Sequence, residues 1–420
     1  MSAGARMSPE VRASIERDVA VVGAGPIGLA TALLLNRAGI PAARLTVFDR
    51  RPPPAGVAAA DLPIDLRVFA LSRASERILR AAGAWPEIAA TRTGPYERMH
   101  VWHGDVPPHG GEALVFDAAE MGERDLGVIA ENAVLQAALA NAARRAGIGF
   151  EAADVEALTQ HRDRVELAAG ARRFAARLVV GADGAMSRVR ELAGLGAARA
   201  DYGQTALVAM IATAKPHRHT AWQRFLGDGT LAFLPLADGR CSIVWSLPTA
   251  RAESLLAASP AEFIRALETD FDGALGRLEL ASERLKFPLW RLAADHYVTS
   301  RVALVGDAAH VVHPLAGQGA NLGLLDAAAL ADVVAAGIAE REDIGAERIL
   351  RRYERWRRSE NDLMATAIDG FDRLLARGNG RVATLAQRGL PFVNRAPLAK
   401  RAFIERAMGL AGELPAAARM

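Results

Sequence analysis

The sequence predicts an α/β fold, in which a Rossmann-like domain of three layers carries an inserted β-sheet domain and precedes a C-terminal helical region. Three observations support this prediction. A glycine-rich turn joins an apolar strand to a helix near the N-terminus. Two glycine–aspartate motifs follow apolar strands that begin near Leu178 and Val302. Between these two motifs, apolar and polar residues alternate in short runs, which is typical of strands.

The first motif, at residues 18–28, is typical of a dinucleotide-binding turn. Its apolar half predicts a buried strand, and a helix over residues 26–38 follows the turn. Gly23 permits the tight turn, Gly25 lets the backbone approach a pyrophosphate, and Gly28 lets the helix pack closely on the strand. The free N–H groups at the start of the helix favour phosphate binding.

A second strand at residues 45–48 ends at Asp49, roughly 20 residues beyond the glycine turn, as the dinucleotide fold requires. The Asp49 carboxylate is placed to accept hydrogen bonds from ribose hydroxyls, and Arg50 beside it is a further predicted contact. The alternative is that Asp49 is an ordinary surface carboxylate.

The second motif follows an apolar strand at residues 178–180 and contains Asp183 and Gly184. We predict that this motif binds the ribityl or pyrophosphate part of a flavin dinucleotide. The alternative for Asp183 is that its carboxylate caps the helix predicted at residues 187–192.

The third motif places Gly306 and Asp307 directly after an apolar strand at residues 302–305. At the carboxyl end of a strand, Asp307 can meet a cofactor bound at the edge of the sheet. The three motifs together predict that one FAD is bound by three distant stretches of the chain.

A glycine-containing loop follows the third motif and leads into a long apolar helix. Gly317 and Gly319 allow the main chain to pass close to a flat ring. The start of the helix near Asn321 is predicted to point at the pyrimidine edge of the flavin. The helix dipole there would stabilise negative charge on the reduced ring.

Asp307, His310 and His313 recur every three residues, a spacing that could suggest a metal site. Pro314 and the glycines after it predict a loop instead of a helix, and no further group of ligands accompanies them, so no metal is predicted. Two roles stay open for the histidines: hydrogen bonds within the loop, and proton handling near the flavin.

The composition excludes several other classes of protein. The formal net charge of +3 gives no indication of nucleic-acid binding. The single cysteine, Cys241, excludes an internal disulfide framework and fits a reducing compartment. The apolar run at residues 19–35 contains glycines and lacks the basic flank of a secretory signal, and we expect no other apolar stretch to span a bilayer.

The predicted domains are discontinuous in sequence. We assign residues 18–75, 96–195 and 296–340 to the FAD-binding domain, residues 76–95 and 196–295 to the substrate domain, and residues 341–420 to the C-terminal helical region. Helices are expected at residues 70–82, 132–145, 260–271 and 321–339, and strands at residues 99–102, 114–116, 207–211, 231–234 and 242–245.

The three motifs in this order resemble the class A flavoprotein aromatic hydroxylases, the group that includes para-hydroxybenzoate hydroxylase. The chain is more similar still to the bacterial ubiquinone-biosynthesis hydroxylases, above all to those that hydroxylate C5 of a polyprenylphenol. The resemblance covers about residues 18–412, and the loop from His313 to Gly323 is its most specific part. The other segments that carry it are 65–72, 221–226, 232–236, 241–246, 306–312, 352–355 and 407–410.

The resemblance implies further cofactor contacts. Arg67 matches an arginine that lies against the isoalloxazine in relatives. Asn132 stands where relatives have an arginine or glutamine that contacts the FAD phosphates, so this residue departs from the pattern. Gly319, Ala320 and Asn321 match backbone contacts to the flavin ring.

The resemblance also implies a monooxygenase cycle. NAD(P)H reduces FAD, O2 adds at flavin C4a, and the hydroperoxide transfers oxygen to an electron-rich ring. The implied substrate is a polyprenylated phenol, hydroxylated at C5. The alternatives are hydroxylation at C6 or C1, oxidation of another apolar aromatic or isoprenoid, and a non-catalytic FAD-bound scaffold. His313 and Gln318 are the candidate polar groups at the reactive face of the flavin.

A polyprenyl substrate resides in a membrane, and the C-terminal segment has a composition that suits one. From Arg373 onward the chain carries nine basic and two acidic residues, with apolar residues between them from Leu390 to Met408. We predict that this segment either contacts acidic lipid or a quinone-biosynthesis protein complex, or covers the cofactor domain. We expect a cytoplasmic protein, peripheral at the inner membrane, and leave homo-oligomerisation open.

Overall fold

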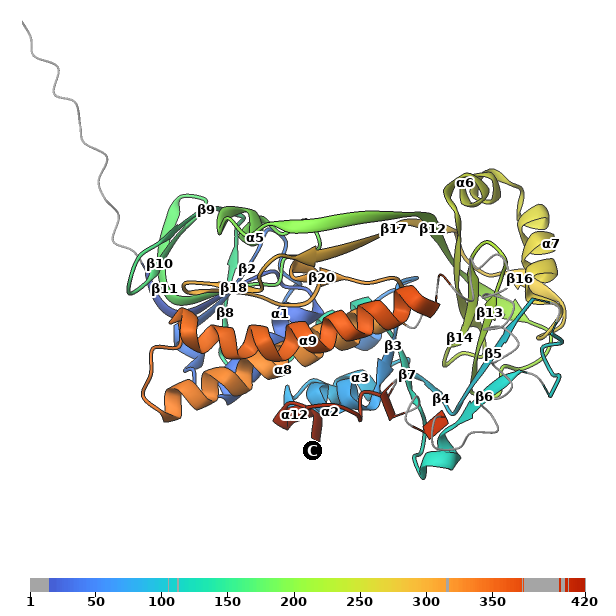
Figure 1. Cartoon of the computed structure of the whole chain (residues 1–420), viewed down its shortest axis with the longest axis horizontal. Coiled ribbons are helices and arrows are strands. Elements are labelled where there is room, and N and C mark those ends of the chain that lie inside the picture. Colours follow the sequence, from blue (N-terminus) through green and yellow to red (C-terminus); the bar gives the residue numbers. More distant parts are fainter. Residues whose placement is uncertain are drawn as a thin grey trace, which may run out of the picture.

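A computed structural model describes residues 15–371 apart from residues 105, 112, 315 and 316, and then residues 373, 400–401, 405–406 and 408–419. The described residues form two large sheets that are connected by two long strands, β12 (Ala197–Thr213) and β17 (Leu285–Ala294) (Figure 1). One sheet is mainly parallel and carries helices, and the other is mainly antiparallel. The predicted α/β class with an inserted β-sheet domain is confirmed.

The cofactor domain is built on the mainly parallel sheet, in which β19, β11, β1, β2 and β8 run in the same direction. Parallel strands end at one edge of a sheet, so the loops that follow β1, β11 and β19 lie side by side. Those loops contain the three predicted motifs. The sheet comprises β18 (Val298–Thr299), β19 (Val302–Leu304), β11 (Arg172–Gly181), β1 (Ile15–Val22), β2 (Leu45–Asp49) and β8 (Gly149–Ala152). β10 (Val165–Ala169) also pairs with β11, and β9 (Val155–Gln160) pairs with β10.

The helices of this domain pack on one another and bury a continuous apolar core with the sheet. In Figure 1 the long helices α8 and α9 lie side by side. The helices are α1 (Pro26–Arg37), α2 (Arg73–Ala81), α3 (Trp85–Ala89), α4 (Asn132–Arg145), α5 (Arg188–Leu192), α8 (Gln318–Ala339), α9 (Glu347–Phe371) and α12 (Ala416–Arg419). A small sheet of β3 (Val68–Ser72), β7 (Gly127–Glu131) and β4 (Gly94–Tyr96) completes the domain.

The substrate domain consists of the nine-stranded sheet and two covering helices. One face of the sheet packs against α6 (Thr249–Ala257) and α7 (Pro260–Phe271), where Trp245, Phe263 and Phe271 are fully buried. Side chains on the other face line a cavity that also touches the cofactor domain. Besides β12 and β17, the strands are β20 (His310–Val311), β15 (Cys241–Pro248), β14 (Thr230–Pro235), β13 (Thr220–Phe225), β5 (Arg98–His103), β6 (Leu114–Asp117) and β16 (Leu278–Leu280).

The structure draws the domain boundary near residue 95 differently from the sequence prediction. β5 pairs in parallel with β13 and antiparallel with β6, so residues 98–103 and 114–117 belong to the substrate sheet. Conversely, the apolar side chains of α2, α3 and the turn between them are buried in the core of the cofactor domain: Ile78, Leu79, Ala82, Ala84, Trp85 and Ile88. Strand pairing between segments more than a hundred residues apart decides this assignment, and local pattern does not encode it.

Two predicted helices begin elsewhere. Residues 70–72 belong to strand β3, and α2 starts at Arg73 because the Ser72 hydroxyl accepts a hydrogen bond from the Ser75 N–H. α8 begins at Gln318, three residues earlier than expected.

Helix α8 also corrects the expectation that no further stretch could span a bilayer. By length and composition this helix is apolar enough to do so, and 67% of its most apolar window is buried inside the protein. α1, α2 and α9 all pack against it. Burial of this kind is typical of the core helix of a folded domain.

The described C-terminal residues pack on both domains, Met408 in an apolar cluster with Val101 and Leu114 of the substrate sheet, and α12 against α2 and α8. Met408, Ala417 and Ala418 are buried, and the Ala416 N–H donates to the Asp332 carboxylate over 2.7 Å. The basic and apolar segment from Leu390 to Met408 lies mostly outside the described residues.

Candidate active site

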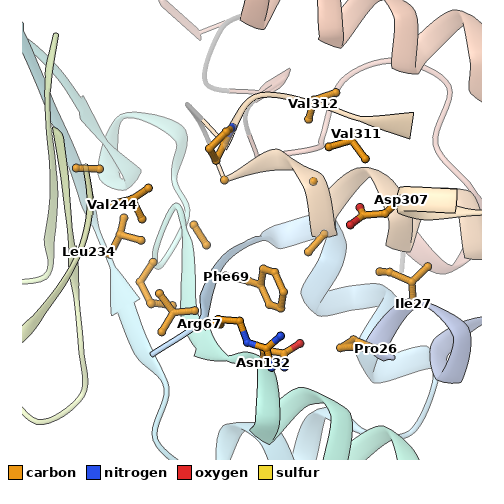
Figure 2. A pocket seen from close by; sticks show the side chains of 18 of the residues that line it. Pro26, Ile27, Arg67, Phe69, Asn132, Leu234, Val244, Asp307, Val311 and Val312 are labelled. Carbon is orange, nitrogen blue, oxygen red and sulfur yellow. The ribbon is translucent and has the colours of Figure 1, made fainter. Parts of the chain in front are cut away.

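A cavity of about 510 Å³ lies where the cofactor domain meets the substrate sheet. In Figure 2, Leu234 and Val244 of the sheet lie on the opposite side of this cavity from Asp307 and Ile27 of the cofactor domain. All three predicted motifs reach the cavity wall, through Gly25, Gly184 and Asp307 among others. The sequence expectation that three distant stretches converge on one site is thus met by the geometry.

The three glycines of the first motif occupy three different environments. Gly23 has a φ of +109°, and a Cβ there would lie 2.3 Å from the Ala182 carbonyl oxygen. A Cβ on Gly28 would lie 2.0 Å from the Gly23 carbonyl oxygen. Gly25 has no atom within 4 Å of the position that a Cβ would occupy, and it lines the cavity. Gly23 and Gly28 therefore serve the fold, whereas Gly25 leaves room for a ligand.

Helix α1 presents free N–H groups beside this space. Its N-cap is Gly25, and no side chain caps the helix. Gln136 Nε2 donates to the Ala24 carbonyl over 2.8 Å, which holds the glycine turn against α4. The arrangement fits a pyrophosphate, because uncapped helix N-termini bind anions.

Asp49 supports the same turn. One carboxylate oxygen accepts from the Ala24 N–H over 2.8 Å, and the other accepts from the Arg51 N–H over 2.8 Å. Asp49 is half-buried and Arg50 is exposed, and neither lines the cavity. Each carboxylate oxygen keeps a second lone pair that a ribose hydroxyl could reach.

In the second motif, the structure shows the capping role for Asp183. Its carboxylate accepts hydrogen bonds from the Ser187 hydroxyl and from the N–H groups of Arg188, at 2.7 Å, and Val189, at 3.0 Å. These bonds satisfy the start of α5. Gly184, with a φ of +81°, lines the cavity in its place.

Asp307 is the acidic side chain on the cavity wall. The accessible surface of this side chain faces the interior of the cavity. Burial by the surrounding protein raises the pKa of the Asp307 carboxyl, and the charge of His310 acts in the opposite direction. No described residue forms a hydrogen bond with its carboxylate. An unpaired acceptor in this position fits a hydroxyl group of a bound cofactor.

The loop before α8 and the first turn of that helix bring main chain to the wall of the same cavity. Gly317 has a φ of +61° and is the N-cap of α8, without a side-chain cap. Gly319 and Ala320 line the cavity, and no atom lies within 4 Å of a Cβ built on Gly319. The first N–H groups of α8 therefore lie beside the cavity, as predicted for stabilising a reduced flavin ring.

The Asn321 side chain is buried and does not line the cavity. It accepts from the Ser72 N–H over 2.9 Å and from the Ser75 hydroxyl over 2.7 Å, and it donates to the Ala70 carbonyl over 2.9 Å. The side chain thus fixes α8 against β3 and α2.

Arg67 and Asn132, implied by resemblance alone, lie together on the cavity wall (Figure 2). Asp65 organises both: its carboxylate accepts from the Arg67 N–H over 2.9 Å, from Asn132 Nδ2 over 3.4 Å and from the Ala133 N–H over 3.2 Å. Asp65 thereby caps α4. The sequence prediction missed this role, although Asp65 begins one of the segments that carry the resemblance.

The histidines of the third motif form hydrogen bonds inside the protein. His310 Nε2 contacts Asp326 Oδ2 at 2.5 Å, and Asp326 also accepts from Arg357 Nε over 2.8 Å. Burial alone would raise the pKa of Asp326, but His310 and Arg357 outweigh burial and lower it to about 2. This network lies directly behind the Gly306 N–H, which donates to Asp326 over 3.1 Å.

His313 and Gln318, the candidate catalytic residues, are buried and do not line the cavity. His313 Nε2 forms a hydrogen bond with Gln204 Oε1 at 3.0 Å and its ring packs on Tyr202. Their neighbours Pro314 and Gly317 do line it. Among the described residues, no group of His, Cys, Asp and Glu could hold a metal ion.

Comparisons with known proteins agree with this geometry. The sequence matches the family described as "FAD binding domain" over residues 16–366. The 3-demethoxyubiquinol 3-hydroxylase of Escherichia coli (strain K12) is 35% identical over 396 residues, which cover 94% of this chain and 98% of that protein. The ubiquinone hydroxylase UbiL of Rhodospirillum rubrum is 35% identical over 395 residues, covering 93% and 89%. The crystal structure of p-nitrophenol 4-monooxygenase PnpA from Pseudomonas putida DLL-E4 shares the fold, with a TM-score of 0.74 at 19% identity and coverage of 96% and 100%.

Proposed function

This chain belongs to the FAD-binding family of class A flavin monooxygenases, and we propose that it hydroxylates a polyprenylated phenol in ubiquinone biosynthesis. FAD is its cofactor, O2 its co-substrate and NAD(P)H the electron donor typical of the family. The observation that carries the proposal is the cavity, because it joins the three FAD motifs to an apolar sheet face.

The residues on the cofactor side would bind and orient FAD. The α1 N-terminus at Gly25 would bind the pyrophosphate, and the Asp307 carboxylate would accept a hydrogen bond from a hydroxyl of the ribityl chain. When bound, FAD supplies the chemistry that activates O2 and transfers one oxygen atom to the ring. The α8 N-terminus near Gly319 would stabilise negative charge on the cofactor.

The residues on the sheet side would hold the ring and exclude water. Ala221, Ala232, Leu234 and Val244 make most of this wall apolar. Tyr96 also lines the cavity, and burial together with the charge of Asp125 raises the pKa of its hydroxyl, so the hydroxyl stays protonated and can donate a hydrogen bond. A dry wall protects an oxygen-transfer step from competing hydrolysis.

His313 and Gln318 remain proposed polar groups of the reactive face. Because they flank the lining residues without lining the cavity, we propose that they position these residues, His313 from the loop before α8 and Gln318 from the first turn of that helix. His313→Ala is expected to lower the fraction of NAD(P)H oxidation that yields hydroxylated product, with FAD content unchanged.

The proposed ring position is C5, with C6 and C1 as alternatives. The name of the Escherichia coli relative places its own reaction at position 3 of a demethoxyubiquinol. Analysis of the quinone intermediates that accumulate in a deletion strain distinguishes the three positions, because the accumulated ring is unsubstituted at the position that this enzyme would hydroxylate.

The proposed reaction is tested on the purified holoenzyme. Anaerobic mixing with NADPH should bleach the flavin absorbance, and addition of a prenylated phenol with ¹⁸O2 should yield a product that carries one ¹⁸O atom. Product oxygen that derives from water alone would refute the monooxygenase reaction. A non-catalytic scaffold would show no phenol-stimulated oxidation of NADPH.

A tailed substrate supports a proposal of peripheral attachment to the inner membrane. The predicted contact is the basic and apolar segment beyond Leu390, whereas the described helix α12 packs on α2 and α8. Co-sedimentation of the full chain with acidic liposomes, compared with neutral ones, tests the attachment.

A further inference from the structure

Two segments that carry the family resemblance lie outside the three FAD motifs. Residues 221–225 of one segment lie on β13 and residues 241–246 of the other lie on β15, with β14 between them in the sheet. All three strands contribute side chains to the sheet side of the cavity. These segments therefore belong to the part of the cavity that would face the substrate.

Three polar side chains interrupt the apolar wall there. Gln223, Thr230 and Ser246 all line the cavity, and their exposed fractions are 5%, 5% and 1%. Within the part of the chain that the structure describes, none of the three side chains forms a hydrogen bond. Buried polar groups in proteins are nearly always paired, so a polar group left unpaired at a cavity indicates a ligand.

The strand register brings the three side chains to one region of the wall. Thr230 is paired with Ser246 across β14 and β15. Gln223 is paired with Ala232, which lies two residues beyond Thr230 on the same face of β14. Side chains in such direct and diagonal positions are within reach of one another. A single aromatic ring can therefore contact all three.

We propose that Gln223, Thr230 and Ser246 form a head-group site that hydrogen-bonds the ring oxygen of the phenol. The proposal rests on the proposed function and names the residues that orient its substrate. Each hydroxyl can donate and accept, and the glutamine amide offers both a donor and an acceptor, so the set matches a phenolic hydroxyl. The apolar residues around it, such as Leu234 and Val244, contact the rest of the ring.

Orientation follows from this arrangement. With its oxygen bound by the head-group site, the ring presents one edge to the flavin side of the cavity. The head-group site would therefore determine which ring carbon is hydroxylated, a property that the FAD motifs do not encode.

The test compares two ligands on the holoenzyme without NAD(P)H: 2-geranylphenol, and geranylbenzene, which lacks the hydroxyl. Binding is followed by the change in flavin absorbance. We expect the wild type to prefer the phenol by about tenfold or more, because a site built for a hydroxyl rejects the ring without it. Gln223→Leu, Thr230→Val and Ser246→Ala should each reduce this preference about 2- to 10-fold.

Ser242→Ala is the matched control. Ser242 lies on the same strand as Ser246, is fully buried, has no hydrogen-bond partner among the described residues and does not line the cavity. This variant should keep the wild-type preference. FAD content and the melting temperature of each variant establish that the single variants fold.

Three results would overturn the assignment: wild-type preference in all three variants, equal weakening of both ligands, or no preference in the wild type. If neither ligand perturbs the flavin of the wild-type holoenzyme, the proposed function itself is overturned, and the head-group site with it. The two failures are therefore distinguishable.

Discussion

Replacing Gly25 and Gly28 by alanine should separate cofactor binding from folding. The two glycines stand three residues apart in one motif, yet the space around them differs completely. A methyl group on Gly28 would overlap the Gly23 carbonyl oxygen at 2.0 Å, whereas one on Gly25 meets nothing within 4 Å. Gly25 has φ −71° and ψ 171°, a conformation that alanine adopts without strain.

The two substitutions should affect the free energy of unfolding of the apoprotein differently. Gly28→Ala should lower the free energy of unfolding by about 1–3 kcal/mol or more, because it overpacks a contact between backbone atoms. Gly25→Ala should leave it unchanged or raise it by about 0.4–1 kcal/mol, through the reduced entropy of the unfolded chain. The added methyl group, however, occupies the space through which the pyrophosphate reaches the α1 N–H groups. Loss of one hydrogen bond to a charged group weakens FAD binding by about 1.5–3 kcal/mol, or roughly 10- to 100-fold.

The assay is thermal or urea unfolding of the apoprotein with and without FAD. At 100 times the wild-type Kd, FAD should stabilise the wild type by about 2.7 kcal/mol and Gly25→Ala by only about 0.4–1.4 kcal/mol. Gly227→Ala is the matched control, because Gly227 also has open space around it and lies outside the cavity. Wild-type stabilisation of Gly25→Ala by FAD, or wild-type stability of apo Gly28→Ala, would refute the reasoning.

Three further predictions concern single features of the structure. Asp307→Ala should weaken FAD binding about 10- to 100-fold, measured by titration of the apoprotein, while the apoprotein loses no stability, because burial raises the pKa of this unpaired carboxylate. The pKa of Asp326 falls from 3.8 to about 2 on folding. Its ionised carboxylate therefore adds about 2 kcal/mol to the free energy of unfolding above pH 4, and this contribution is lost as the pH falls toward 2. Asp326→Asn should therefore cost about 3–5 kcal/mol at neutral pH, because Arg357 stays buried, and less at pH 2 in urea unfolding. Deletion of residues 413–420 should lower the unfolding free energy by about 2–3 kcal/mol, because the apolar contacts that Ala417 and Ala418 make with α2 and α8 and the bond to Asp332 are lost, with FAD content unchanged. An unaltered melting temperature would contradict the packing described for this segment.

Much of the cofactor site could be predicted because its signals are local. Gly25, Gly184 and Asp307 each follow a strand within a few residues, and parallel strands necessarily end at one edge of the sheet. The prediction was less complete where a side chain has two possible partners. Asp183 could contact a cofactor or cap α5, and only the described hydrogen bonds show the cap.

The substrate side shows the opposite case. Gln223 and Ser246 stand in recognisable segments, but nothing in the sequence indicates that they face a cavity or that Thr230 lies beside them. Their proximity depends on the pairing of β13, β14 and β15 and on the packing of that sheet against the cofactor domain. Strand pairing also explains why β5 and β6 belong to the substrate sheet and not, as the sequence predicted, to the FAD-binding domain.

The sequence by itself determined the α/β fold and the FAD-binding motifs, because backbone conformation at glycine and the order of strands and helices depend on short segments. The monooxygenase class followed from the resemblance of those segments to known hydroxylases and not from the local pattern. Only the tertiary structure decided which side chains line the sheet side of the cavity. Those contacts join residues on separate strands, and the free energy that places them comes from burial of the whole sheet face and not from any local pattern.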